Sequence, residues 1–338
     1  MYDKNNEINN IKSEVDMSIP NSKDFFENTI EDFDSIVVFS HVKPDGDAYG
    51  SSMGLKLALQ GLFPEKKCYC VGSYDEPMPE DFEKPIKPGE LSIDIIKNSL
   101  CIITDTGTKA RIEDPRALEG KFVVKIDHHA PDDHFGDLEF VDDAKSSCSV
   151  IVADMLFASF PVIPANAASA ILLGILSDTD GLKLALEADD FYKVGRLIYN
   201  GADFYKTYHS ISSNSLKDIE LNRAILNATK IEGKVIYTVF NKEQIKELGT
   251  TADELAGKVN QYGFADECPI WAMFVENENG TVRAEYRCEL GYDVSEVAKM
   301  FNGGGHMQSS GGTLTSLALV DDVVKALIGI EKNETNRH

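Results

Sequence analysis

The chain has 338 residues, of which 43% are hydrophobic, so it is long enough for two globular domains that each bury a core. It contains no apolar run near the ~18 residues of a membrane span, which predicts that it does not cross a membrane. The formal net charge of −23 excludes binding of long nucleic acid by bulk electrostatics, because each phosphate contact needs a local cation. A polyanionic substrate would therefore have to be short.

The N-terminal segment and the cysteines both indicate a cytoplasmic protein. Residues 1–21 are polar and rich in asparagine, without the apolar segment of a secretion signal, and we expect them to form a disordered lead-in. The six cysteines include no C-x-x-C pair, which is typical of free thiols in a reducing compartment.

Apolar periodicity predicts a first domain, over residues 22–200, in which strands alternate with helices. Strands are expected at 36–40, 67–71, 100–104, 121–126 and 138–141, with helices at 22–33, 53–59, 149–160 and 165–177. A loop rich in proline and charge is expected at 74–90. This alternation is typical of a doubly wound, mostly parallel α/β sheet.

The rest of the chain is predicted to form a helical connection and a smaller α/β domain. Residues 189–227 read as helical with breaks, and 201–227 are assigned to the interdomain connection. The second domain, 228–338, is expected to contain hairpins at 230–239 and 270–287, helical residues 241–262, and helices at 293–301 and 320–331.

The turn after the first strand carries three side chains of the kinds that bind metals. His41, Asp45 and Asp47 lie at the carboxyl end of the strand, where open α/β sheets bind their ligands. Such groups at close range repel each other unless a cation joins them, and a hard divalent metal would do so. The alternative is an Asx turn in which Asp45 only caps the following helix.

Three further segments end in residues of the same kinds. Asp105 follows the third strand, Asp127, His128 and His129 follow the fourth, and Asp178 ends a helix. Because the carboxyl ends of parallel strands lie at one edge of a sheet, we expect these side chains to converge. Two histidines and four carboxylates suit two ions ~3.5–4 Å apart that clamp a phosphoryl group. Ligation without thiolate favours manganese, with cobalt, iron or magnesium as alternatives.

A glycine-rich tract near the C-terminus is a second candidate site. Gly303, Gly304, Gly305 and His306 follow a predicted helix, and backbone amides without side chains can approach a phosphate closely. Arg287, at the end of a strand, is placed for a bidentate phosphate contact. A plain glycine-rich loop is the alternative interpretation.

The chain resembles the DHH phosphoesterase family, in the subfamily with a DHH-associated C-terminal domain. The resemblance rests on motifs in the family's order: His41-x3-Asp45-Gly-Asp47-Ala-x-Gly-Ser51, Asp105-Thr-Gly, Asp127-His128-His129, Asp178-Thr and Phe301-Asn-Gly-Gly-Gly-His306-x-x-Ser-Ser-Gly311. It implies an active site in the cleft between the two domains.

The resemblance also implies roles for single residues. One manganese would be held by His41, Asp45 and Asp105, and the other by Asp47, Asp105, His128 and Asp178. His129 would face the substrate phosphate and help to protonate the leaving oxygen, and Asp127 would orient a histidine. Catalytic roles thus fall to Asp105, Asp127, His128 and His129. Substrate phosphate would be bound by Arg287, Gly303, Gly304, Gly305 and His306.

Two residues beside the motifs are further candidates for phosphate contacts. Ser51 is expected to act either in this way or as a helix-stabilising hydroxyl. Arg111, just after Asp105, is expected either to contact phosphate or to lie in a solvated loop.

Within the family, the closest likeness is to the enzymes that act as oligoribonucleases and 3′-phosphoadenosine-5′-phosphate phosphatases. The substrate would be a short oligonucleotide or a mononucleotide, and the chain is a possible homodimer. Asp180-Gly181-Leu182 replaces the family's usual Gly and aromatic, and Asp180 is a possible competing ligand. A cyclic dinucleotide phosphodiesterase, an inorganic pyrophosphatase and a non-catalytic nucleotide sensor remain alternatives.

Overall fold

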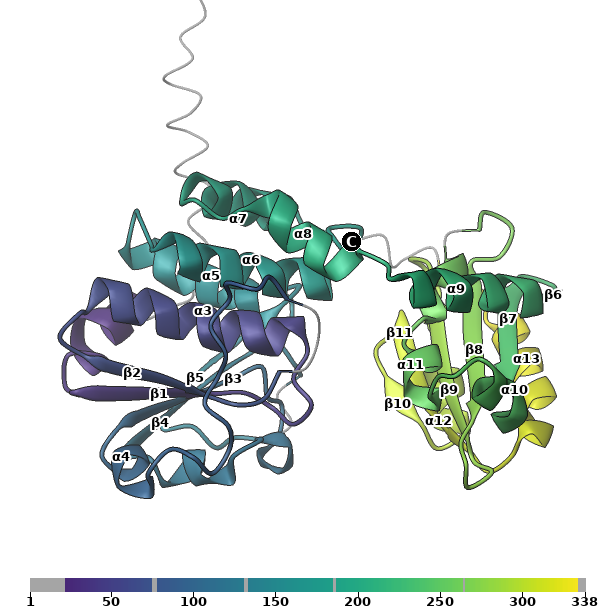
Figure 1. The fold of residues 1–338 in the computed structure, drawn as a ribbon, viewed down its shortest axis with the longest axis horizontal. Coiled ribbons are helices and arrows are strands. Elements are labelled where there is room, and N and C mark those ends of the chain that lie inside the picture. The colour runs from purple at the N-terminus through teal and green to yellow at the C-terminus, as the bar shows by residue number, and fades with distance from the viewer. Residues whose placement is uncertain (1–21, 75–77, 131–132, 185–186, 264, 334–338) are drawn as a thin grey trace, which may run out of the picture. The chain divides into compact units, whose positions relative to one another are not determined.

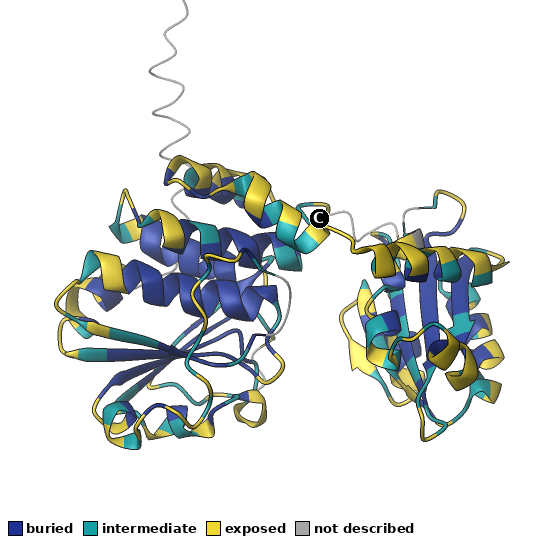
Figure 2. Cartoon of the chain, viewed as in Figure 1, coloured by how far each residue is buried: buried dark blue, intermediate teal, exposed yellow. Residues whose placement is uncertain are grey.

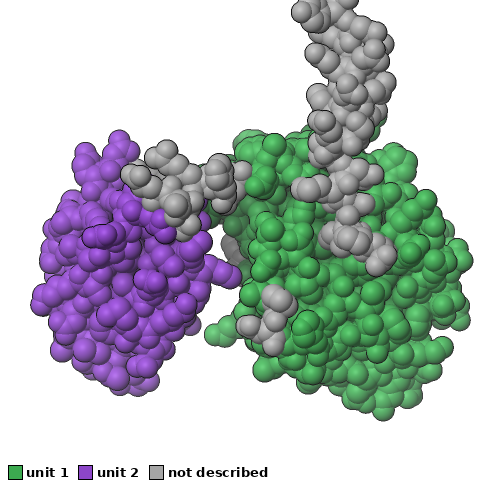
Figure 3. Space-filling view, turned by 180° about the vertical axis from the view of Figure 1, so that it is seen from behind, with its two compact units in different colours: residues 1–213 green, residues 214–338 purple. Residues whose placement is uncertain are grey.

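The computed structural model describes residues 22–74, 78–130, 133–184, 187–263 and 265–333, so the expected lead-in at 1–21 lies outside the described residues. The chain divides into two compact units, residues 1–213 and 214–338 (Figure 3). Of the segment predicted to connect the domains, helix α8 (Phe204–Ser212) belongs to the first unit and helix α9 (Leu216–Ala228) to the second.

A five-stranded sheet forms the centre of the first unit (Figure 1). Its strands are β1 (Ser35–Phe39), β2 (Lys67–Val71), β3 (Leu100–Thr104), β4 (Phe122–Asp127) and β5 (Leu138–Val141). They pair in the order β2-β1-β3-β4-β5, and every pair is parallel. The predicted α/β class and parallel sheet are confirmed.

Both faces of this sheet are covered, because alternate residues of each buried strand point to opposite sides. One face packs against α3 (Gly46–Leu62), α5 (Cys148–Ser159) and α6 (Ala165–Asp178), and the other against α4 (Ile93–Lys97) and the 3₁₀ helix η3 (Pro115–Glu119). Val38 and Ile102 lie in the first core, whereas Val37 and Ile103 lie in the second. Figure 2 shows the middle of the sheet and most of α3 and α6 as buried, with less buried residues on the outer strands. Helices α7 (Ala188–Tyr199) and α8 form an outer layer over α6.

The strand order determines where a ligand site is expected. Neighbouring strands β1 and β3 send their connections in opposite directions, to β2 and to β4, so the chain reverses its winding between them. In sheets of this order, ligands bind in the crevice outside the carboxyl ends of these two strands. Helix α3 starts at this point and lies very close to α6, since a Cβ at Gly50 would meet the backbone nitrogen of Gly174 at 2.6 Å.

Several boundaries in the first unit differ from the prediction. Helix α3 begins at Gly46, directly after Asp45, rather than near residue 53. The predicted helix 22–33 is a helical turn, Ser22–Asp24, followed by a π-helix, Phe25–Thr29. Helix α4 was not predicted, because five residues carry too short an apolar pattern to separate from a loop.

The second unit is built on a six-stranded mixed sheet. Its strands are β6 (Lys230–Glu232), β7 (Val235–Phe240), β8 (Ile270–Glu276), β9 (Val282–Cys288), β10 (Gly304–Gly305) and β11 (Ser309–Leu314), in the order β10-β11-β9-β8-β7-β6. The predicted hairpins β6–β7 and β8–β9 are both antiparallel pairs. Helices α12 (Ser295–Met300) and α13 (Val320–Gly329) cover one face, and α9, α10 (Lys242–Glu247) and α11 (Ala252–Ala256) cover the other.

The glycine tract differs most from its predicted structure. Neither of its two interpretations, a phosphate-binding tract or a plain loop, included a strand, but Gly304 and Gly305 form the edge strand β10, which pairs with Gly311 and Ser310 of β11. The hairpin was missed because strands are normally recognised by their apolar side chains, which glycine lacks. Among the helices of the described residues, none is both long and apolar enough to span a bilayer.

Candidate metal centre

The predicted ligands of the first unit lie at the carboxyl edge of the parallel sheet. His41 follows β1, Asp105 follows β3, and His128 follows β4, whose last residue is Asp127. Asp178 is the last residue of α6 and reaches the same place from the helix layer. The structure therefore brings together side chains that are up to 137 residues apart in the sequence (41 to 178).

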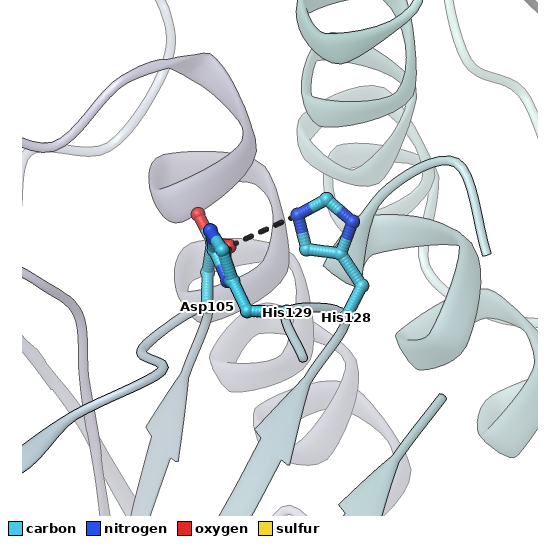
Figure 4. Close-up of side chains that lie close together, drawn as sticks. All are labelled: Asp105, His128 and His129. Carbon is cyan, nitrogen blue, oxygen red and sulfur yellow. Dashed lines mark ion pairs between the residues drawn. The ribbon is translucent and has the colours of Figure 1, made fainter. Parts of the chain in front are cut away.

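Asp105 lies at the centre of the group. Its Oδ2 is 3.3 Å from Nε2 of His41, and its Oδ1 is 3.4 Å from Nε2 of His128. Figure 4 shows the second of these contacts and the ring of His129 close to the same carboxylate. Asp105 has a φ of 55°, a left-handed conformation in which its amide donates to the carbonyl of Ile126. A carboxylate with an imidazole at each oxygen is placed to bridge two cations.

His41 is buried and held with one ring nitrogen directed at Asp105. Its Nδ1 donates to the carbonyl oxygen of Val42 at 2.9 Å. That bond fixes the proton on Nδ1 and leaves Nε2 as the electron-pair donor, the form in which histidine binds metals.

Asp45 caps a helix and also lies beside His41, so its position is compatible with both of the predicted alternatives. Its Oδ1 accepts hydrogen bonds from the amides of Asp47 and Ala48 and so caps helix α3. The same oxygen lies 3.9 Å from Nε2 of His41. A cap leaves lone pairs of the carboxylate unused, so capping does not exclude metal binding.

Asp47 is fully buried and is held by a second helix. Its two carboxylate oxygens accept the amides of Cys148 and Ser149 at 2.7 and 2.9 Å, in the first turn of α5. Helix N-termini stabilise negative charge, so Asp47 can stay ionised at a buried position when a cation is also close. Its Oδ2 lies 4.0 Å from Nε2 of His128.

Asp178 occupies an unfavourable position for a carboxylate without a cation. It ends helix α6, where the helix dipole is negative, and its Oδ2 lies 3.5 Å from Nε2 of His128. Burial, together with the charge of Asp47, raises the pKa of Asp178 well above its usual value, although His128 acts in the opposite direction.

The described residues form three groups whose donor atoms lie within 4.8 Å of one another: His41, Asp45 and Asp105; Asp47, His128 and Asp178; and Asp105, His128 and His129. The first group has the residues of one predicted ligand set, and the second has those of the other except Asp105; the third group contains Asp105 together with His128. Two divalent ions would balance the charge of the four carboxylates. Oδ1 of Asp105 is buried with no hydrogen-bond partner among the described residues, as expected for an atom reserved for a cation. The donor set therefore fits two metal ions.

The pKa values of the metal-free centre indicate where protons take the place of cations. Burial and the charge of Asp105 raise the pKa of Asp47 to about 7. Burial alone would lower the pKa of His128, but its contact with Asp105 and the negative charges of Asp47, Asp105 and Asp178 raise it to about 10. At neutral pH the metal-free centre therefore carries a proton on His128.

We expect metal affinity to rise with pH, because a metal binds the neutral imidazole and must displace that proton. Since the pKa of His128 is raised to about 10, proton competition persists throughout the neutral range. Affinity for Mn²⁺ should increase by about tenfold per pH unit for each proton released. Calorimetric titration in buffers of different ionisation enthalpy counts those protons. A pH-independent affinity without proton release would contradict the expectation.

His129 and Asp127 form a separate pair beside the predicted ligands. Nδ1 of His129 lies 2.7 Å from Oδ1 of the fully buried Asp127. The carboxylate thus orients the ring and directs Nε2 away from Asp127, toward the side where the imidazole is partly exposed.

Lys125 was not predicted from the sequence, although it belongs to the same arrangement. Its buried ammonium lies 3.3 Å from Oδ2 of Asp127 and donates to the carbonyls of Gly107 and Asp133. The available signal was a lysine among the apolar residues that precede Asp127 in the strand Phe122–Asp127. Lys125 neutralises Asp127 and links it to the loops that follow β3 and β4.

Three other candidates have clear positions. Ser51 was predicted either to contact phosphate or to stabilise its helix; it is fully buried and its hydroxyl donates to Oγ1 of Thr104, which favours a structural role. Arg111 is exposed, and its Nη2 lies 3.4 Å from Nδ1 of His41, at the rim of the centre. Asp180 is outside all three ligand groups of the described residues and pairs with Lys183 at 3.1 Å.

The predicted phosphate contacts of the second unit lie on neighbouring strands. Gly304, Gly305 and His306 are exposed on the β10 side of the β10–β11 hairpin. Arg287, on β9, pairs in register with Ser309 of β11, and its Nη1 donates to Oε2 of Glu285 at 3.3 Å. The arginine and the glycine tract thus belong to adjoining parts of one sheet.

Comparison with known families gives two matches that together span most of the chain. The N-terminal domain of the DHH family matches residues 35–175, and the DHHA1 domain matches residues 216–333. The first match includes every predicted ligand except Asp178.

Two relatives align over nearly their whole length. The chain is 32% identical over 305 residues to the probable bifunctional oligoribonuclease and PAP phosphatase NrnA of Streptococcus mutans, covering 90% of this chain and 97% of that protein. It is 30% identical over 302 residues to the bifunctional oligoribonuclease and PAP phosphatase NrnA of Mycoplasma genitalium, covering 88% and 94%. An exopolyphosphatase-related protein from Bacteroides fragilis has the same fold, with a TM-score of 0.80 at 22% identity over 93% and 97% of the two chains.

Proposed function

The chain belongs to the DHH family and is a phosphoesterase, and from this premise we propose that it hydrolyses short oligonucleotides to nucleoside monophosphates and removes the 3′-phosphate of 3′-phosphoadenosine-5′-phosphate. The proposal is supported above all by Asp105, whose carboxylate joins two groups of candidate ligands at the edge between β1 and β3. The names of the relatives support the choice of substrate.

We propose that His41, Asp45 and Asp105 hold one divalent ion, and that Asp47, Asp105, His128 and Asp178 hold a second. When bound, the two ions would supply hydroxide at neutral pH and neutralise the phosphate. Manganese is the proposed metal, because the donors are carboxylates and imidazoles. The thiol of Cys148, beside Asp47, is not a competing ligand, since it donates to the carbonyl of Ile126 and burial raises its pKa well above the usual value.

His129 is the proposed proton donor to the leaving oxygen. Its ring is held by Asp127 at 2.7 Å, and Asp127 is in turn held by Lys125 at 3.3 Å. This chain of contacts fixes the imidazole in one orientation, as proton transfer to a departing oxygen requires.

In the second unit, we propose that Arg287 and residues 303–306 bind a substrate phosphate. The exposed edge of β10 lacks side chains at Gly304 and Gly305, so a phosphate oxygen can reach the backbone. Glu285 holds the guanidinium of Arg287 on one side and leaves its other nitrogens for a ligand. A net charge of −23 restricts binding to substrates with few phosphates.

A substrate panel with the Mn²⁺-loaded full chain tests the proposal. We expect turnover of a linear dinucleotide and of 3′-phosphoadenosine-5′-phosphate, and no cleavage of a 24-nucleotide RNA. Pyrophosphate or a cyclic dinucleotide as the best substrate would overturn it in favour of the pyrophosphatase or the cyclic dinucleotide phosphodiesterase. Tight nucleotide binding with no hydrolysis of any compound would favour the sensor. The native metal, dimerisation and a cytoplasmic location stay predictions.

A further inference from the structure

A closed ring of four charged side chains is buried beside the metal centre. Nζ of Lys145 lies 3.0 Å from Oδ2 of Asp154 and 3.2 Å from Oδ2 of Asp189. Nζ of Lys193 lies 2.5 Å from Oδ1 of Asp154 and 2.6 Å from Oδ1 of Asp189. Each lysine therefore bridges both aspartates, and the side chains are between 4% and 12% exposed. The ring joins α5, α7 and the loop that precedes α5.

One member of the ring is connected to a candidate ligand. Nδ1 of His128 donates to the backbone carbonyl oxygen of Lys145 at 3.3 Å. That bond leaves Nε2 of His128 as the nitrogen that faces Asp47, Asp105 and Asp178. The position of the Lys145 backbone therefore sets the direction of the imidazole.

The loop that carries Lys145 is also held beside the ring, because the hydroxyl of Ser146 donates to Oδ1 of Asp190 at 2.8 Å and the amide of Lys145 donates to the carbonyl of Asp142 at 3.3 Å. It leaves β5 at Val141, and the amide of Asp142 donates to the carbonyl of Asp127. The loop ends at Ser147, the N-cap of α5, whose next two amides hold Asp47. The anchored Lys145 therefore carries the carbonyl that orients His128, and it lies just before the helix α5 amides that hold Asp47.

The ring is poorly explained as a source of stability alone. Four charges taken out of water lose hydration, and apolar side chains of similar volume often stabilise a fold equally well. The ring holds the Lys145 side chain in one position. Burial alone would lower the pKa of Lys145, yet the charges of Asp154 and Asp189 raise it, so the ammonium stays charged and keeps both contacts.

We infer that Lys145 is a positioning residue: its ammonium, held in the buried ring by Asp154 and Asp189, places its own carbonyl oxygen so that His128 is aimed at the metal centre. The inference rests on the proposed function, because the role of His128 as a ligand comes from there. It predicts that releasing Lys145 weakens the binding of one of the two ions.

Two matched double variants separate positioning from stability. K145M/D154N and K193M/D189N each remove one positive and one negative charge and keep one intact pair. The first keeps Lys193 with Asp189 and frees the 145 backbone, whereas the second keeps Lys145 with Asp154 at 3.0 Å. Mn²⁺ binding to the full chain is followed by the spectral signal of the free ion, and the melting temperature of each metal-free variant is measured.

We expect both variants to melt at similarly lowered temperatures, but only K145M/D154N to bind one ion about 10–100-fold more weakly. Its turnover of a dinucleotide should recover at high Mn²⁺, with KM for the dinucleotide unchanged. Equal Mn²⁺ affinities in the two variants would overturn the inference. If a double variant does not fold, K145Q and K193Q provide the same comparison. Wild-type protein that binds fewer than two ions would instead overturn the proposed function.

Discussion

Replacement of Asp105 by asparagine is expected to abolish turnover while the fold survives. Asparagine tolerates the left-handed φ of 55° at this position and keeps the amide that donates to Ile126. The asparagine side chain lacks the negative charge that lies between His41 and His128. Its NH₂ group also takes the place of one carboxylate oxygen and cannot bind a cation there. If the bridging carboxylate contributes about 4 kcal/mol to the transition state, kcat falls about 10³-fold.

The measurement is hydrolysis of a dinucleotide at saturating Mn²⁺, together with circular dichroism and thermal melting of D105N. D114N is the matched control. Asp114 is also buried in the first unit, but it pairs with Arg116 and caps η3 and belongs to none of the ligand groups of the described residues. D114N should lose stability and retain turnover. Substantial hydrolysis by D105N would exclude a bridging role for Asp105.

The sequence was sufficient to predict the convergence of the ligands, for a simple geometric reason. Asp105 and His128 each follow an apolar run that is buried on both faces of a parallel sheet, and such runs end at one edge. The positions of Asp105 and His128 directly after these strands were therefore enough to predict that the two side chains lie close together, without knowledge of the side-chain packing. The strand pattern does not place Asp178, because this residue ends a helix and a helix end can point in many directions.

The sequence was not sufficient to predict which groups support the ligands. The contact of Asp47 with the amides of Cys148 and Ser149 joins residues about a hundred positions apart, and no side-chain pattern marks a backbone donor. The two alternatives for Ser51, a phosphate contact or a structural hydroxyl, could not be separated from the sequence; the side chain faces Thr104 inside the protein, because its helix presents that side to the sheet. Such details depend on helix rotation, which binary patterning determines only coarsely.

The loop after Asp178 is the part of the site where family resemblance predicts least. Asp180, Gly181 and Leu182 all have positive φ, with Leu182 at 75°. A leucine in that region is strained, and strain of this kind gathers at ligand-binding segments. The loop replaces the residues that are usual in the family, so we expect it to affect the choice of nucleotide rather than the metal centre.

Replacement of His129 by alanine should lower kcat for a dinucleotide by about 10²–10⁴-fold, the usual contribution of a general acid. The two proposed metal sites should keep their ligands, because His129 is outside both proposed ligand sets. KM should therefore change little, and Mn²⁺ should bind as in the wild type. H134A is the matched control, since His134 is an exposed histidine of the following loop that pairs with Glu139.

The identity of the leaving group distinguishes proton donation by His129 from a positional effect. A sugar oxygen leaves as a strong base and needs a proton, whereas p-nitrophenolate leaves without one. With the p-nitrophenyl ester of a nucleoside 5′-phosphate, H129A should therefore regain most of the wild-type rate. An equal loss of rate with both substrates would mean that His129 places the phosphate instead, and that the proton comes from solvent. The contact with Asp127 would then serve to hold a binding group, and Lys125 would stabilise the turn without a part in proton transfer.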